Sequence, residues 1–258
     1  MLQLSQIQGA IFDIDDTLLS NHPGGQAHGL HERSRLAAIH EIGRLRNIPE
    51  LEHFSVEANI TTFLTAKVHS LEGAMWNTLL LAGLVQDEDI DHNHLILQEL
   101  VRRKNELHED ILRQEGREVP GATAFVKALA AHGLHDKLAI ASTAYRRDID
   151  IFLDLYHLQP LFPDHRIISG ERLTHPKPHP HAFSSAFASL GLPEGAQAYV
   201  LAVEDDPRGI TSAKAAGLFT CAITTRFSKA ALAALPVAPD LIIGSYAELN
   251  DALLSVDR

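Results

Sequence analysis

Six short apolar runs rich in Ile, Val and Ala punctuate the chain, and polar residues follow them. Within these runs there is little alternation with polar positions, which is typical of strands covered on both faces in a parallel sheet. We therefore expect strands at Gly9–Phe12, Lys137–Ala141, Arg166–Ile168, Ala198–Val203, Phe219–Ile223 and Asp240–Ile243.

Helical patterns lie between most of these runs. We expect helices at 122–132, 179–190 and 207–217. Glycine follows the first two, as is common after a helix, and Asp206-Pro207 places a possible N-cap before a proline at the first helical position. Strands that alternate with helices predict an α/β fold, a doubly wound, Rossmann-like parallel sheet core.

The interval between Phe12 and Lys137 is too long for one crossover helix. Nothing in this interval indicates a strand. It contains four helix-like stretches, at about Leu30–Leu45, Ser55–Val68, Leu71–Ala82 and His92–Gln114. We predict an α-helical cap domain of roughly 90 to 100 residues inserted after the first strand. The predicted division is residues 1–20 and 117–258 for the α/β catalytic core and residues 21–116 for the cap.

The charge of the chain excludes some partners. Among 258 residues, 22 Lys and Arg stand against 33 Asp and Glu, a net charge of −11. Nucleic acids and anionic membranes bind proteins with concentrated positive charge, so we expect neither as a partner. Protonation of all 16 histidines would reverse the sign, so the balance depends on pH.

The compartment is inferred from two further features. No apolar run approaches the roughly 18 residues of a membrane span, and Met1–Ile7 lacks the basic region of a signal peptide. The single cysteine, Cys221, lies in an apolar run typical of a core strand and cannot form an internal disulfide or a cysteine-based zinc site. We expect a cytoplasmic protein.

Polar side chains gather where the predicted strands end. Asp13, Asp15 and Asp16 follow the first strand, Ser142 and Thr143 follow the second, and Glu204-Asp205-Asp206 follow the fourth, with Lys177 in the segment before it. In an open parallel sheet, ligands bind beyond the carboxyl ends of the strands. Clustered carboxylates need a cation, and a set of oxygen ligands suits Mg²⁺.

This grouping suggests chemistry on a phosphoryl group. One aspartate can attack an electrophile while a second serves as acid or base. Asp13 and Asp15 are separated by one residue, so both can face the same pocket. Lys177 and Ser142 can then orient an anion, most simply a phosphoryl group.

The same residues resemble the haloacid dehalogenase-like superfamily of phosphotransferases. Four motifs match in order: Asp-Ile-Asp-Asp-Thr-Leu at 13–18, Ser142 after an apolar strand, Lys-Pro-His-Pro at 177–180, and Val-Glu-Asp-Asp-Pro-Arg-Gly-Ile at 203–210. The match covers nearly the whole core, whereas the cap matches only in position and helical character. Within the family, it points to the helical-cap branch of phosphoglucomutase-like and phosphatase-like members.

The resemblance implies a role for each matched residue. Asp13 would be the nucleophile that forms an aspartyl-phosphate, and Asp15 would protonate the leaving oxygen and then activate water. Ser142, with Thr143 beside it, and Lys177 would bind the phosphoryl group. Mg²⁺ would be held by Asp13, the backbone carbonyl of Asp15, Asp205 and Glu204.

Two departures from the commonest family pattern leave alternatives open. Asp16 stands where glycine is commonest, so a left-handed backbone there would have to be tolerated by aspartate. Asp206 stands where serine is commoner, and it either touches the metal or caps the following helix. Taken singly, each residue also has a structural explanation: Asp16 as a turn residue, Ser142 and Thr143 as the end of a strand, and Lys177 as an ordinary loop charge. Their joint occurrence at strand ends favours the catalytic interpretation.

The resemblance therefore implies a hydrolase, a Mg²⁺-dependent phosphatase acting on a small phosphorylated metabolite beneath a cap that opens and closes. Asp15 favours phosphate esters, since the dehalogenating branch generally lacks an acid/base there. The first alternative is a phosphosugar mutase similar to beta-phosphoglucomutase, which shares every core motif. A further alternative is a phospho-accepting switch or a non-catalytic binding module. The sequence does not indicate the substrate or the oligomeric state.

Several other residues have both structural and functional interpretations. His92, His94, His175, His179 and His181 have some character of metal ligands, but solvated surface positions explain them better. The segment containing Met75, Trp76 and Leu79–Leu81 is expected in the cap core, and Lys67 and His69 are possible specificity residues that a solvated face explains equally well.

Overall fold

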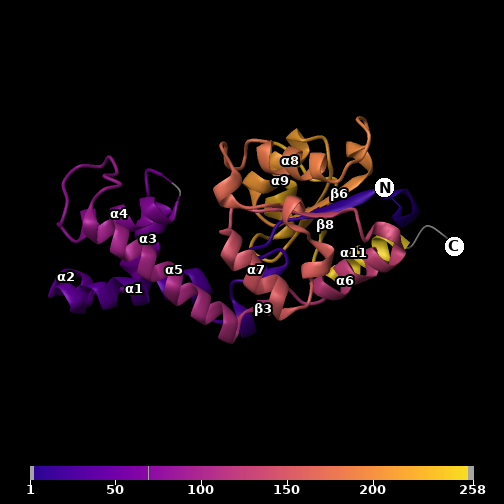
Figure 1. Cartoon of the computed structure of the whole chain (residues 1–258). Coiled ribbons are helices and arrows are strands. Elements are labelled where there is room, and N and C mark those ends of the chain that lie inside the picture. The colour runs from indigo at the N-terminus through magenta and orange to yellow at the C-terminus, as the bar shows by residue number, and fades with distance from the viewer. Residues whose placement is uncertain (1–2, 69, 255–258) are drawn as a thin grey trace. The chain divides into compact units, whose positions relative to one another are not determined.

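The computed structural model of the chain describes residues 3–68 and 70–254. It divides into two compact units, residues 1–20 with 116–258 and residues 21–115, which we call the core unit and the helical unit. Figure 1 shows the strands of the sheet in the first and a bundle of helices in the second. The sequence analysis placed the first junction at 20/21 and the second at 116/117, one residue later than the division between these two units.

A six-stranded parallel sheet forms the centre of the core unit, in the order β5-β4-β1-β6-β7-β8. The α/β prediction is confirmed, and each observed strand overlaps a predicted one. The bounds are β1 Gly9–Phe12, β4 Leu138–Ala141, β5 Ile167–Ile168, β6 Val200–Glu204, β7 Phe219–Ile223 and β8 Leu241–Ile243.

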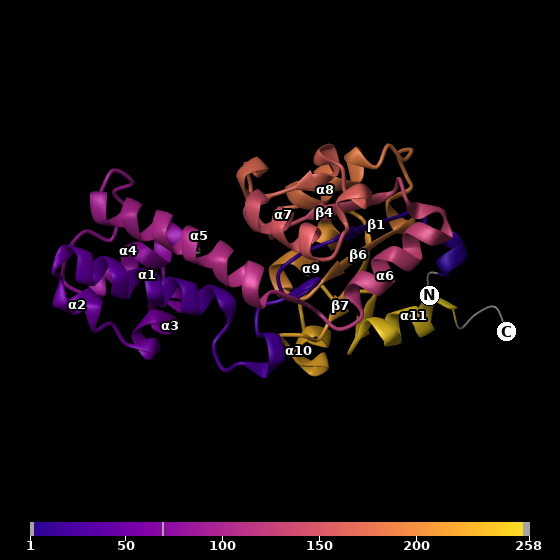
Figure 2. The same cartoon turned by 60° about the horizontal axis from the view of Figure 1, so that its bottom comes forward.

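Both faces of the sheet are covered, which explains why its strands lack polar alternation. Successive side chains of a strand point to opposite faces. On one face, Ile11 belongs to the cluster built with α8 (His181–Ser189) and α9 (Pro207–Ala215). On the other, Phe12 contacts the ring of Phe125 in α6 (Ala122–Leu129), which contacts Tyr246 in α11 (Tyr246–Leu254). Figures 1 and 2 show these two helical layers.

The predicted helices of the core unit are present with shorter bounds. α6 ends at Leu129 and continues as a π-helical turn over Ala130–Leu134, and α8 begins two residues later than expected. Helices α7 (Arg146–Leu155), α10 (Lys229–Ala233) and α11 were not predicted. Cys221 is fully buried in β7, which confirms its core position.

A short ladder corrects the expectation that the interval after the first strand holds no strand. β2 (Leu19–Ser20) pairs antiparallel with β3 (Arg117–Glu118), in the register Leu19 to Glu118 and Ser20 to Arg117. Two residues per strand are too few to produce a periodic pattern, so the sequence carried no signal for this ladder. It joins the two segments of the core unit that flank the helical unit.

The described residues of the helical unit form five α-helices: α1 Leu30–Arg46, α2 Pro49–Glu52, α3 Val56–Leu64, α4 Leu71–Leu81 and α5 Leu95–Glu115. Four of them match the predicted stretches, and the single-turn α2 was missed. Met75, Trp76 and Leu79 are buried in its hydrophobic core as expected, but Leu81 is exposed because it lies on the outer side of α4. Within the described ranges, no helix is both long and apolar enough to cross a bilayer.

Candidate active site

Three neighbouring strands bring the predicted site residues to one edge of the sheet. β4, β1 and β6 lie side by side, all parallel. Asp13 directly follows β1, Ser142 directly follows β4, and Glu204 is the last residue of β6. The carboxyl ends of adjacent parallel strands meet at the same edge, so these residues, far apart in sequence, become neighbours there.

Lys177 reaches this edge from the segment between β5 and α8. Its Nζ donates to Asp13 Oδ1 at 2.7 Å and to Glu204 Oε1 at 2.5 Å. The lysine side chain is only 7% exposed, and its ammonium lies over the ring of Phe183 at 4.9 Å. One buried positive charge therefore joins carboxylates at the carboxyl ends of two different strands.

Glu204 is held by backbone groups as well as by Lys177. Its Oε2 accepts hydrogen bonds from the backbone N–H groups of Asp205 at 2.8 Å and Asp206 at 2.9 Å. α9 begins close by, and a Cβ at Gly209 would lie 1.6 Å from Glu204 Oε1. Only glycine allows the helix to start this close to the carboxylate, which places the positive end of the helix beside it.

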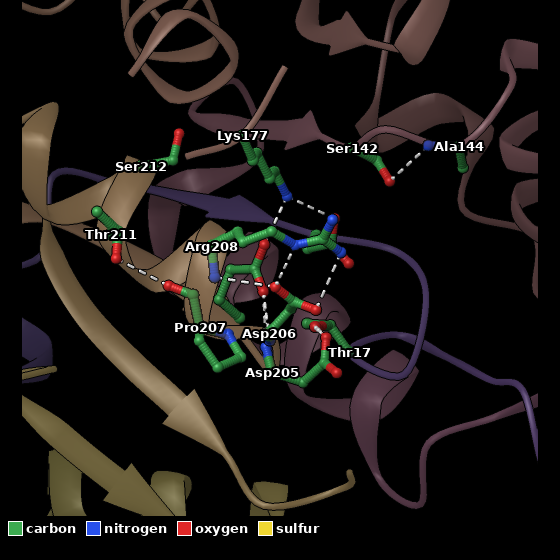
Figure 3. A network of polar contacts seen from close by, with 12 residues as sticks. Thr17, Ser142, Ala144, Lys177, Asp205, Asp206, Pro207, Arg208, Thr211 and Ser212 are labelled. Carbon is green, nitrogen blue, oxygen red and sulfur yellow. Dashed lines mark hydrogen bonds and ion pairs between the residues drawn. The ribbon is translucent and has the colours of Figure 1, made fainter. Parts of the chain in front are cut away.

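Asp205 has one engaged and one open carboxylate oxygen. The Thr17 hydroxyl donates to Oδ1 at 3.1 Å, as Figure 3 shows. Oδ2 is buried and, among the described residues, accepts no hydrogen bond. A buried carboxylate oxygen without a hydrogen-bond donor is costly, and a cation at this atom would offset that cost.

Asp13, Glu204 and Asp205 are buried and offer carboxylate oxygens that all lie within 4.8 Å of one another. We call these three residues the acidic cluster. Oxygen ligands of this kind are those that Mg²⁺ and Ca²⁺ prefer, and the open Asp205 oxygen lies among them. The residues present thus fit a divalent cation.

The pKa values reflect an excess of negative charge. Burial, together with the charges of Glu204 and Asp15, raises the pKa of Asp13 to about 8 despite the opposing effect of Lys177. Burial and the neighbouring carboxylates also raise the pKa of Asp205 well above its usual value. Burial alone would lower the pKa of Lys177, but the carboxylates of Asp13 and Glu204 outweigh it and raise that pKa.

The two residues after Asp13 in the first motif have different environments. Asp16 has a φ of 55°, so the left-handed backbone expected there is present, and aspartate tolerates it. Asp15 is half-buried and lies outside the acidic cluster, although its charge acts on Asp13. Its predicted metal contact, through the backbone carbonyl, remains a prediction.

The two hydroxyls after β4 are less directly connected to the acidic cluster. Ser142 is buried, and its Oγ accepts a hydrogen bond from the backbone N–H of Ala144 at 3.2 Å (Figure 3). Thr143 is exposed. Both stay predicted phosphate-binding residues.

Asp206 caps α9. Its Oδ1 accepts from the backbone N–H of Arg208 at 2.9 Å and from the Arg208 guanidinium at 3.0 Å. Burial opposes ionisation, but Arg208 outweighs burial and lowers the pKa of Asp206. Of the two roles left open by the sequence, the structure therefore supports the capping role.

Some residues of the site carried no clear signal in the sequence. Thr17 lies inside the first motif, yet its contact with Asp205 was not expected. Gly209 lies in the fourth motif, and only the close approach of α9 explains it. Arg226, from the loop after β7, lies near Asp16, Asp205 and Asp206 and belongs to no motif.

Among the other candidate residues, Lys67, His92, His175 and His179 are exposed, whereas His94 and His181 are partly buried. The rings of His175 and His179 stack with centroids 4.6 Å apart, and His181 meets both edge-on. In the helical unit, His92 pairs with Glu72 at 3.1 Å, the ring of His94 packs against Trp76, and Lys67 pairs with Asp89 at 2.7 Å. His69 lies outside the described residues.

Comparison with known sequences identifies related proteins. The sequence model of the haloacid dehalogenase-like hydrolase family matches residues 7–217. The protein CbbY of Rhodobacter capsulatus is 35% identical over 101 residues, which make up 39% of this chain and 42% of the relative.

Comparison with solved structures identifies the same fold. A family IA, variant 3 hydrolase of this group from Entamoeba histolytica superposes with a TM-score of 0.72 at 20% identity, over 96% of this chain and 98% of the other. CbbY from Rhodobacter sphaeroides, solved in complex with phosphate, superposes with a TM-score of 0.66 at 21% identity, over 97% of this chain and 100% of the other.

Proposed function

The chain belongs to the haloacid dehalogenase-like hydrolases, and from this membership and the acidic cluster we propose a specific reaction. We propose that the protein is a Mg²⁺-dependent phosphatase that hydrolyses a small phosphorylated metabolite through an aspartyl-phosphate on Asp13. The observation that carries the proposal is the buried Lys177 ammonium, which bridges Asp13 and Glu204.

The first step forms the covalent intermediate. A carboxylate oxygen of Asp13 attacks phosphorus, and the bond between phosphorus and the leaving oxygen breaks. Lys177 favours the ionised Asp13 that the attack requires, against the effect of burial. Asp15 donates a proton to the leaving oxygen, so the product departs as a neutral hydroxyl.

The second step releases phosphate. The ionised Asp15 takes a proton from water while the water oxygen attacks phosphorus, and the bond to Asp13 breaks. This restores the Asp13 carboxylate and the Asp15 acid, and inorganic phosphate leaves. Ser142 and Lys177 orient the phosphoryl oxygens in both steps.

The acidic cluster would hold the cation, with the open Oδ2 of Asp205 as its clearest ligand atom. When bound, Mg²⁺ supplies positive charge that offsets the charge of the phosphoryl oxygens. The chain itself must keep the carboxylates in place, and Lys177, Thr17 and the N–H groups at the start of α9 do so.

The nucleophile is tested with an aryl phosphate and Asp13→Asn. We expect turnover to fall at least about 1000-fold, because an amide is a far weaker nucleophile than a carboxylate. Mass spectrometry after an acid quench should find one added phosphoryl group on the peptide that contains Asp13, and none in the variant. Substantial residual turnover with a phosphorylated Asp13→Asn protein would show that another residue is the nucleophile.

The substrate class is tested with a panel of sugar phosphates. Another crystal structure of CbbY from Rhodobacter sphaeroides contains xylulose-1,5-bisphosphate, which makes sugar bisphosphates a reasonable first group to assay. Release of inorganic phosphate supports the phosphatase. Interconversion of hexose phosphate isomers without phosphate release would instead identify a mutase.

A further inference from the structure

Arg226 lies beside the acidic cluster, near carboxylates that Lys177 does not contact. Its guanidinium lies 3.8 Å from Asp205 Oδ2, 3.7 Å from Asp16 Oδ2 and 3.4 Å from Asp206 Oδ2. The side chain is 42% exposed and stacks over the ring of Phe227 at 5.5 Å. Lys177 and Arg226 therefore lie near different carboxylates of this edge of the sheet, and Asp206 is also paired with Arg208.

The contacts of the two cations differ in kind. Lys177 donates hydrogen bonds at 2.5 and 2.7 Å, which fix the positions of Glu204 and Asp13. The distance from Arg226 to Asp205 Oδ2 is too long for a hydrogen bond, and that oxygen stays open. Arg226 thus lowers the electrostatic cost of the buried Asp205 without occupying its lone pairs.

Asp16 is one of the three carboxylates that face Arg226, together with Asp205 and Asp206. Arg226 donates a hydrogen bond to Asp206 at 3.4 Å. Asp16 is buried and has a left-handed backbone, and its charge raises the pKa of Asp205. The Thr225 hydroxyl donates to the backbone carbonyl of Asp16 at 2.6 Å, so the loop that carries Arg226 is tied to the Asp16 turn. A fourth buried carboxylate and a second cation are thereby held next to each other.

We infer that Asp16 and Arg226 form a compensating pair that sets the affinity of the acidic cluster for Mg²⁺. Asp16 strengthens metal binding, whereas Arg226 weakens it and stabilises the metal-free protein. This inference rests on the proposed Mg²⁺ site. Its physical basis is that a cation near a metal ligand repels the metal, whereas in the metal-free state the same cation reduces repulsion among the carboxylates.

The test is calorimetric titration of the full chain with Mg²⁺. Arg226→Gln is expected to tighten Mg²⁺ binding about 3- to 10-fold, a modest effect because the half-exposed side chain is partly screened by solvent. Asp16→Asn, which keeps a residue that tolerates the left-handed backbone, should weaken binding by a similar factor of about 3 to 10. The double variant should lie within about two-fold of wild type, since the two charges cancel.

Two further variants separate charge from structure. Arg226→Lys keeps the charge and should retain the wild-type affinity. Arg172→Gln removes an arginine with the same 42% exposure that pairs with Asp164 instead, and it should not change the affinity. Thermal unfolding adds an independent measurement: Arg226→Gln should unfold at a lower temperature than wild type in EDTA, and the difference should shrink in saturating Mg²⁺.

The outcomes distinguish this inference from the proposed function. An Arg226→Gln protein that binds Mg²⁺ with wild-type or weaker affinity overturns the role of Arg226 and leaves the Mg²⁺ site intact. A wild-type protein that binds no Mg²⁺ overturns the metal assignment and, with it, this inference.

Discussion

Removal of the Lys177 ammonium should destabilise the metal-free protein more than most single substitutions. At an effective dielectric constant of about 20, a contact of 2.7 Å between unit charges gives about 6 kcal/mol of attraction before desolvation is subtracted. Lys177 has two such contacts, and the carboxylates of Asp13 and Glu204 are 8% and 1% exposed. Removing one partner of a buried pair typically costs about 3–5 kcal/mol, which we expect for Lys177→Met.

The loss should depend on pH with a definite sign. Lys177 opposes the rise in the pKa of Asp13, so without it that pKa in the folded protein is higher still. An acid with a raised folded pKa keeps its proton at low pH and loses stability as pH rises towards that pKa. The difference between wild type and Lys177→Met should therefore be larger at about pH 9 than at about pH 6.

Urea denaturation in EDTA measures this difference. Lys214→Met is a suitable control, because Lys214 also pairs closely with a carboxylate, Asp240 at 2.7 Å, but is 27% exposed. A pair near the surface contributes about 0–1 kcal/mol, so this control should lose little. A Lys177→Met protein within about 1 kcal/mol of wild type at both pH values would refute the view that one buried ammonium holds the carboxylates together.

Three further predictions follow from the same site. Gly209→Ala should lower the free energy of unfolding by about 3 kcal/mol and weaken Mg²⁺ binding, because a Cβ would lie 1.6 Å from Glu204 Oε1. If urea denaturation and Mg²⁺ calorimetry are both unchanged, α9 can shift to make room for the methyl group. Binding of Mg²⁺ at about pH 7 should release protons, since the pKa of Asp13 in the metal-free protein is about 8. Equal heats of Mg²⁺ binding in buffers of different ionisation enthalpy would contradict this release. Asp206→Ala should lower stability by about 1 kcal/mol, as loss of an N-cap does, without abolishing Mg²⁺ binding; loss of metal binding would instead make Asp206 a ligand.

The sheet was predictable because its strands are buried on both faces. A strand covered on both sides is an unbroken apolar run, and the predicted bounds of β1 and β7 equal the observed ones. The order of the strands, by contrast, depends on how the crossover helices pack, and the sequence analysis did not predict it.

The elements that were missed lack such a pattern. α7 mixes arginine and aspartate with its apolar residues, and α2 is a single turn that begins at a proline. β2 and β3 have two residues each, and their pairing is a contact between segments far apart in the chain. Short or long-range features of this kind leave no periodic signal within one stretch of sequence.

The site was predictable as a set of residues but not as a set of contacts. Motif spacing selected Asp13, Lys177, Glu204 and Asp205, which the structure brings together. That one ammonium bridges two of the carboxylates, or that one Asp205 oxygen stays open, depends on side-chain directions and on the start of α9. Arg226 approaches from a loop whose sequence has no distinctive feature, so only the folded chain reveals it.

The β2–β3 ladder makes the helical unit an exchangeable insertion. The chain leaves the core unit after Ser20 and returns at Arg117, and these two residues are register partners. A two-residue Asn-Gly turn is the usual connection between antiparallel strands paired in this way. Such a turn is long enough to connect Ser20 to Arg117 in place of residues 21–116. Evolution or protein engineering can therefore replace one helical insert with another at this point while the sheet and its acidic cluster stay unchanged.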